Sequence, residues 1–249
     1  MSPRLRIGKI LAGLALAACS VGVLAATRVA RIEIASAAAP QAQFEQLVLT
    51  LENPPDIDAM DLALQIERVA SPEAGMRFTR VEWRCRLKHN DAGAWSCEGP
   101  LRAREGRAQL SVSLIDDRIE LSLRQGSARL GAGLDLEATR IDLRADTLPL
   151  AWLQQFLTRV WDGARLTSGT FDAQLAIATA EPLRATGRIA LDAAGLDTRD
   201  GSIAAADLRL AGPIDWTLGD TAQRLRATFE LRGGEVLFGP FYAALPASP

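Results

Sequence analysis

The stretch Leu110–Leu123, LSVSLIDDRIELSL, holds two short runs in which every second residue is apolar, joined by the polar group IDDR. This alternation has the period of a β-strand, in which successive side chains point to opposite faces of a sheet. The charged residues between the runs favour a turn. The stretch therefore predicts a β-hairpin with one apolar face, formed by Leu110, Val112, Leu114, Ile119, Leu121 and Leu123.

The same period of two continues outward from this hairpin in both directions. Clean alternation is typical of antiparallel strands that have one face in water, and it differs from the continuous apolar strands of parallel sheets. We therefore expect a mainly β fold, antiparallel, in one domain over residues 27–249. The expected apolar face includes, besides the hairpin, Leu62, Leu64, Leu134, Leu136, Phe171, Leu175, Ile177, Ile189, Leu191, Phe229 and Leu231.

One segment, LPLAWLQQFLTRVWDGA over residues 148–164, departs from this pattern. Its apolar residues Leu150, Leu153, Leu157 and Val160 follow helical spacing, and Pro149 and Gly163 suit the two ends of a helix. The segment predicts one short amphipathic helix. We expect it to cap an apolar end of the sheet, with docking to a membrane surface or to a partner as the alternative.

The N-terminus has the pattern of an export or membrane signal. Three basic residues precede an uncharged apolar run over residues 10–26, which at about 1.5 Å per residue would span about 25 Å. We expect a transmembrane signal-anchor over residues 1–26, with the rest of the chain in the bacterial periplasm. Two alternatives stay open, a cleaved signal peptide and a lipoprotein signal in which Cys19 is lipidated.

The stretch Trp83–Gly99, WRCRLKHNDAGAWSCEG, contains the only histidine of the chain and two of its three cysteines. A turn centred on Asp91 would place Cys85 opposite Cys97 and Leu87 opposite Trp95. Directly opposed residues are close enough for a disulfide bond after a small adjustment. Because an exported chain meets an oxidising compartment, we expect a Cys85–Cys97 disulfide, with His89 exposed near the tip of the hairpin.

Motifs for chemistry are missing from the sequence. Cys85, His89 and Cys97 supply at most three of the four ligands of a zinc site, and no G-x-S-x-G, P-loop or G-x-G-x-x-G motif occurs. The formal net charge of -2 gives no basic face for nucleic acid. We expect no enzyme activity, no metal or other cofactor and no nucleic-acid partner.

The apolar N-terminal run followed by TRVARIEI, the amphipathic strands and the block RIDLRADTLPLAWLQQFLTRVWDGARLTSGTFDAQLAI together resemble the AsmA-like superfamily of envelope proteins, in particular its YdbH and TamB type. The resemblance implies an elongated, curved sheet that forms an apolar β-groove and shields phospholipid acyl chains between the inner and outer membranes. The groove would be lined by the apolar face named above. Because known members are much longer, the chain is expected to be an N-terminal portion of such a protein.

Alternatives to this interpretation remain at the level of sequence. The same apolar side chains would also suit the filled core of a β-sandwich. The chain could serve as a structural accessory subunit of a secretion or envelope assembly, with an outer-membrane or envelope protein as its partner, or as a periplasmic lipoprotein binding module. The final strand, GGEVLFGPFYAALPASP, would leave an exposed sheet edge, which predicts either further chain or a partner there.

Overall fold

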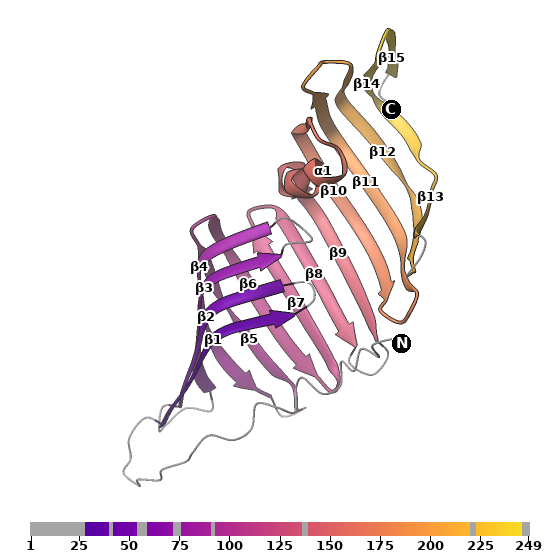
Figure 1. Cartoon of the computed structure of the whole chain (residues 1–249). Helices are drawn as coiled ribbons and strands as arrows, with labels where there is room; N and C mark the ends of the chain where they lie inside the picture. Colours follow the sequence, from indigo (N-terminus) through magenta and orange to yellow (C-terminus); the bar gives the residue numbers. More distant parts are fainter. Residues whose placement is uncertain are drawn as a thin grey trace, which may run out of the picture.

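The computed structural model describes residues 28–39, 42–53, 59–71, 76–90, 93–135, 139–219 and 223–245. It consists of one antiparallel sheet with fifteen strands and one short helical segment (Figure 1). The expectation of a mainly β, antiparallel fold is confirmed. The strands are β1 (Arg28–Ala39), β2 (Ala42–Asn53), β3 (Ala59–Ser71), β4 (Met76–His89), β5 (Trp95–Ala103), β6 (Gly106–Ile115), β7 (Arg118–Gln125), β8 (Ala128–Asp135), β9 (Arg140–Pro149), β10 (Ala164–Ala178), β11 (Leu183–Thr198), β12 (Ile203–Leu218), β13 (Gln223–Ala227), β14 (Glu230–Phe238) and β15 (Phe241–Leu245).

Each strand pairs with the next one along the chain, from β1 to β12. β12 then pairs with β13 along one part of its length and with β14 along another, and β15 pairs with β14. This order needs only short connections between antiparallel neighbours. The sheet curls, so that β1 to β4 come to face the strands on the far side of a hollow (Figure 1).

Bulges bend the strands near one end of the sheet. Thr147, Ala193 and Asp207 have positive φ angles of 50°, 48° and 50°, and the pairing register shifts beside each of them. A bulge adds a residue on one strand, bends it and exchanges the faces to which the following side chains point. On β9, Ala145 and Leu148 are therefore both buried although they are three residues apart.

The predicted helix is confirmed as a 3-10 turn, η3 (Leu150–Leu153), followed by α1 (Gln154–Val160). The side chain of Gln154 anchors it to the start of β10, because its amide nitrogen donates to the Ala164 carbonyl oxygen at 2.9 Å and its amide oxygen accepts from the Leu166 N–H at 2.6 Å. Leu150 is buried beneath the segment. The helix thus has a fixed position against one end of the sheet (Figure 1).

The structure does not form the β-sandwich that the sequence left open. All described strands belong to one sheet, and among the described residues no large side chain is fully buried. A sandwich core would bury such side chains between two layers. The apolar face of this sheet therefore has no second sheet packed against it in the part of the chain that is described.

Three expectations fall outside the described residues: the membrane helix over residues 10–26, the lipidation of Cys19 and the inward position of Leu136. Within the described ranges, no helix has both the length and the apolar character needed to cross a membrane.

The turn between β11 and β12 gives a pH-dependent prediction. The Asp200 carboxylate accepts hydrogen bonds from the Thr198 hydroxyl at 2.7 Å, and from the backbone N–H of Ser202 at 3.1 Å and its hydroxyl at 2.9 Å. These donors, Thr198 first, lower the pKa of Asp200 from 3.8 to about 2. The ionised carboxylate stabilises the folded state fully above pH 3.8, and this contribution is lost as the pH falls toward about 2.

We expect a ¹³C NMR titration of the Asp200 carboxyl to give this low pKa. In a Thr198→Val variant the pKa of Asp200 should rise, because the strongest donor is removed. An unchanged titration in that variant would contradict the assigned cause.

Candidate apolar groove

Apolar side chains form continuous rows across the sheet, because directly opposed residues on neighbouring strands share a face. One row crosses six strands with Leu110, Leu123, Leu130, Ala145, Ala173 and Ile189 in opposed pairs. A second row, closer to the end of the sheet away from the helix, contains Val112, Leu121, Ala132, Leu143 and Leu175. A third contains Leu114, Ile119, Leu134, Ile141 and Ile177. The described residues of the predicted apolar face that belong to strands lie on this one side of the sheet, and Phe229 lies between β13 and β14.

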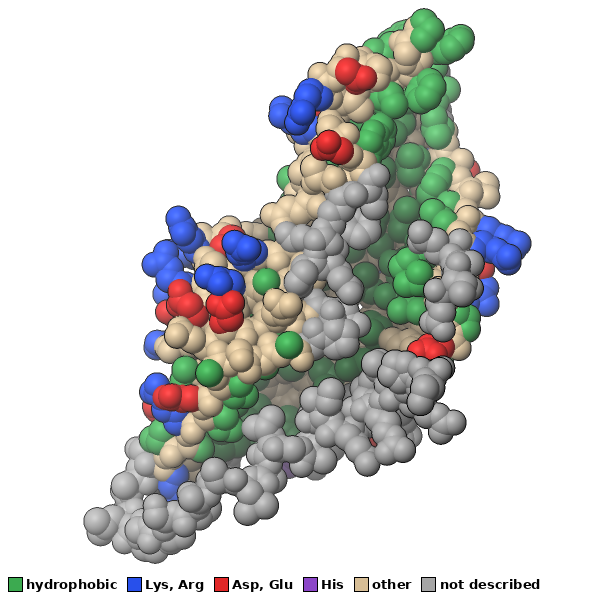
Figure 2. All heavy atoms as spheres, in the orientation of Figure 1, with side chains coloured by type: hydrophobic (Ala, Val, Ile, Leu, Met, Phe, Trp, Pro, Cys, Tyr) green, Lys and Arg blue, Asp and Glu red, His purple; other side chains and the backbone are tan. Residues whose placement is uncertain are grey.

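This side is the hollow of the curled sheet, and we call it the apolar groove. Figure 2 shows apolar side chains gathered inside the hollow and charged side chains along its outer sides. Several groove residues keep a large exposed surface, for example 38% for Leu114, 39% for Leu121 and 51% for Leu231. Contiguous apolar surface of this kind is uncommon on soluble proteins and marks a binding site or an interface.

Two patches of the groove are packed by the protein itself. In one, Ala128, Ala145, Leu148 and Ala173 are buried together. In the other, Trp83 covers the Cys85–Cys97 disulfide bond, and its indole N–H donates to the Leu110 carbonyl oxygen at 3.3 Å. These patches hold neighbouring strands together, while the residues between them stay half-buried.

The disulfide is confirmed, with a Cα–Cα distance of 5.4 Å, but the expected register of its hairpin is wrong. Leu87 lies opposite Cys97, and Trp95 lies opposite His89. Pairing is thus shifted by two residues, and the two cysteines are diagonal neighbours on the groove side. Strand twist brings one diagonal of an antiparallel pair closer together than a flat sheet would, which is why the bond still forms.

His89 is exposed, as expected, and its ring contacts that of Trp95 with 4.6 Å between centroids. Within the described ranges, no group of three or more metal-ligating side chains comes together. The geometry therefore gives His89 a stacking contact at the end of a hairpin.

The outer face of the sheet is polar and carries ion pairs between strands. Arg184 pairs with Asp215 at 2.6 Å, Arg68 with Glu45 at 2.8 Å and Arg209 with Asp192 at 3.1 Å, and all of these side chains are well exposed. The guanidinium of Arg184 lowers the pKa of Asp215. Exposed pairs contribute little stability each, but they show which side of the sheet is made for water.

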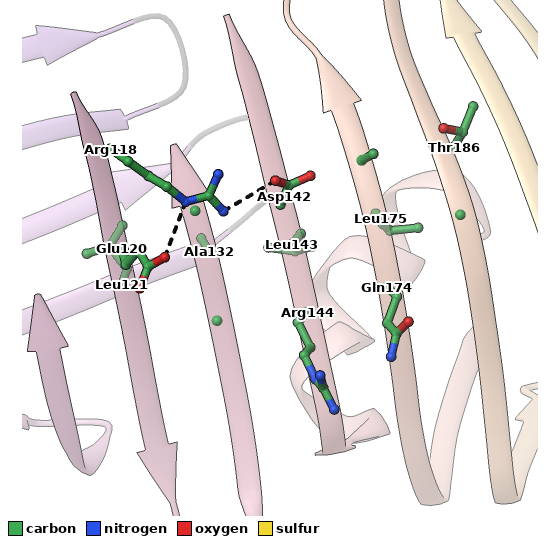
Figure 3. Close-up of a pocket in the computed structure, with 14 residues that line it drawn as sticks. Arg118, Glu120, Leu121, Ala132, Asp142, Leu143, Arg144, Gln174, Leu175 and Thr186 are labelled. Carbon is green, nitrogen blue, oxygen red and sulfur yellow. Dashed lines mark hydrogen bonds and ion pairs between the residues drawn. The ribbon is translucent and has the colours of Figure 1, made fainter. Parts of the chain in front are cut away.

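A shallow depression of about 550 Å³, separate from the apolar groove, lies on this outer face (Figure 3). Arg118 of β7 reaches across β8 to Asp142 of β9 at 3.3 Å and also pairs with Glu120 at 3.2 Å. A Cβ atom at Gly133 would overlap the Arg118 guanidinium, so the glycine leaves the path for this side chain. Hydrogen bonds and charge from Arg140 and then Arg118 lower the pKa of Asp142. The charged side chains that line this depression thus all form ion pairs.

Sequence reasoning missed part of the groove near the helix. One apolar cavity there is lined by Met76, Phe78, Leu101 and Trp152. Simple alternation along the strand would instead put Phe78 on the other face of the sheet from Val81 and Trp83. Arg80, with a φ of 50°, lies between them and interrupts the alternation. A non-glycine residue in this conformation has no local sequence signal.

Comparison with protein-family models, with curated proteins and with solved structures finds no match to this chain. The groove and its chemistry therefore stand on the residues of this chain alone.

Proposed function

We propose that this protein is a non-enzymatic component of the bacterial envelope whose apolar groove binds lipid acyl chains and supports phospholipid transfer between the inner and outer membranes. The observation that carries the proposal is the continuous apolar face that no second layer of described structure covers. Covering such a surface is favourable by about 25 cal/mol per Å² of apolar area removed from water. Acyl chains match a long apolar trough, because they are flexible and need no hydrogen-bonding partners.

The asymmetry of the sheet supports the same proposal. The groove side holds rows of Leu, Ile, Val and Ala, and the outer side holds the ion pairs described above. A sheet that shields lipid in an aqueous compartment needs this division. We base the proposed envelope location on the resemblance of the sequence to AsmA-like proteins and on the apolar N-terminal run. The inner membrane is the proposed site of anchoring.

The test is the amount of phospholipid that co-purifies with the full chain, measured by mass spectrometry. We expect bound phospholipid on the unchanged protein and at least about a tenfold loss for Leu121→Asp/Leu123→Asp, since charge on this face repels hydrocarbon. Ser122→Asp is the matched control, because Ser122 lies between these leucines on the outer face. Its lipid content should be unchanged.

Circular dichroism separates loss of lipid from loss of fold. The double variant should keep its β-sheet signal, because Leu121 is already 39% exposed and an aspartate there stays hydrated. A lipid-free unchanged protein whose double variant unfolds would show that the face is a structural core, and the proposal would fail.

A second function is favoured by one observation at the sheet edge. Phe238, Phe241 and Tyr242 of β14 and β15 are 63%, 74% and 62% exposed, and exposed strand edges with apolar side chains pair readily with other chains. A role as a structural accessory subunit of an envelope assembly would use this edge. Phe241→Glu/Tyr242→Glu should then remove a stable complex with envelope proteins while leaving bound phospholipid unchanged.

A further inference from the structure

The end of the groove beside the helical segment forms a distinct cavity of about 340 Å³. Phe78, Leu101 and Leu123 contribute the sheet side of its wall, and Trp152 of η3 contributes the opposite side. Binding pockets for small ligands range over about 300–1,000 Å³, so this one has room for a single hydrocarbon chain. It lies where the groove ends against the helix.

Part of the apolar wall of this cavity is exposed to solvent. Three of its large apolar side chains are more than a third exposed: Met76 at 41%, Phe78 at 39% and Trp152 at 37%. Its wall is also preformed, because the two hydrogen bonds of Gln154 to β10 fix the segment that carries Trp152. A preformed wall lowers the entropic cost of binding.

Three charged residues also belong to the lining of this cavity. Arg77 and Arg107 belong to its lining, as does Glu105. The Glu105 carboxylate is already occupied by the backbone N–H and the hydroxyl of Thr79, at 3.0 and 2.9 Å. Among the described residues, neither Arg77 nor Arg107 forms an ion pair. Arg77 and Arg107 directly precede groove-side residues on their strands, Phe78 and Ala108, so their side chains point toward the outer face and the cavity itself offers a mainly apolar wall.

We propose that this cavity is a specific binding site for one hydrocarbon chain, which lies against Trp152 and Phe78. The inference rests on the proposed function, in that it names the lipid chemistry taken at one end of the apolar groove. It adds that the helical segment bounds the groove at this end and so limits the length of chain that fits.

The first experiment is isothermal titration of the purified full chain with fatty acids of increasing length, from octanoate to stearate. Each added methylene that enters the cavity should tighten binding about fourfold. The gain should stop at the length at which the cavity is full. Affinity that keeps rising to stearate would mean that the chain lies along the open face, and would overturn the proposal.

Two tryptophans of equal exposure provide matched variants. Trp152 and Trp161 are both 37% exposed and flank the same helix, but only Trp152 lines the cavity. Trp152→Ala should weaken laurate binding at least about tenfold, the loss expected for the apolar contacts of one large side chain. Trp161→Ala should leave the affinity within about twofold. Equal affinities for laurate in the two variants, with phospholipid still bound by the full chain, would overturn this site and leave the proposed function standing.

Discussion

Replacing Cys85 and Cys97 together by alanine is expected to lower the free energy of unfolding by about 3 kcal/mol, the chain-entropy cost of opening a loop of this length. The bond joins β4 to β5 across twelve positions of sequence. It also lies under Trp83 in one of the two packed patches of the groove. Since a single-layer sheet has few such patches, the loss is large relative to the total stability of a typical domain, about 5–15 kcal/mol.

Urea unfolding of the oxidised protein and of the double variant measures this difference. Reductant is the internal control: it should destabilise the unchanged protein by a similar amount and have no effect on the variant. A variant as stable as the oxidised protein would show that the hairpin is held by its packing and strand pairing alone.

The hairpin at Leu110–Leu123 could be predicted in register from sequence because its turn is short. Ile115 pairs with Arg118, so Asp116 and Asp117 form a two-residue turn. The apolar residues of the two runs meet in opposed pairs and share one face, as the alternation predicted for the face. Where a short polar turn separates two alternating runs, the register follows from the sequence itself.

The hairpin at Trp83–Gly99 shows why this reasoning has a limit. The backbone N–H of Asn90 donates to the Ala94 carbonyl oxygen at 3.0 Å, and its side-chain oxygen accepts from the Ala94 N–H at 2.9 Å. The Asn90 carbonyl oxygen accepts from the Gly93 N–H at 3.0 Å. The turn is therefore centred one residue later than Asp91, and every pair shifts by two. Gly93, with a φ of 82°, supplies the left-handed residue that this turn needs. Length and centre of a longer turn depend on such capping bonds.

The choice between an open groove and a filled sandwich could not be made from the pattern. Both folds place alternate apolar residues on one face, so the sequence period is the same. What differs is the curvature of the sheet, which here follows from bulges at non-glycine residues such as Thr147 and Ala193. Their positions depend on pairing with distant strands, which local sequence does not encode.

Gly99→Ala is expected to have a large structural effect for a single methyl group. Gly99 is buried in β5 on the groove side, and a Cβ atom there would overlap the carbonyl oxygen of Arg84 and lie 3.0 Å from the Cα of Cys85. Both contacts are with the backbone of β4, so no side chain can rotate to make room. We expect a loss of about 3 kcal/mol or more, at the upper end for overpacking.

The close approach at Gly99 coincides with an interruption in strand pairing. The β4–β5 register has no paired positions at Arg84 and Cys85, opposite Gly99 and Pro100, and Pro100 has no N–H to donate. The backbone of Arg84 and Cys85 lies over Gly99, and Cys85 forms the disulfide bond with Cys97. Gly99→Ala should push the strands apart and strain the disulfide as well.

Gly131→Ala is the matched control, since the nearest atom to its added Cβ is 3.8 Å away in another central strand. That variant should be neutral or slightly stabilised, by up to about 1 kcal/mol, because alanine restricts the unfolded chain. Urea unfolding measures both variants, and titration of free thiols reports whether the disulfide still forms. Equal stability of the two variants, with the disulfide intact in both, would contradict the close approach of β4 to β5 at Gly99.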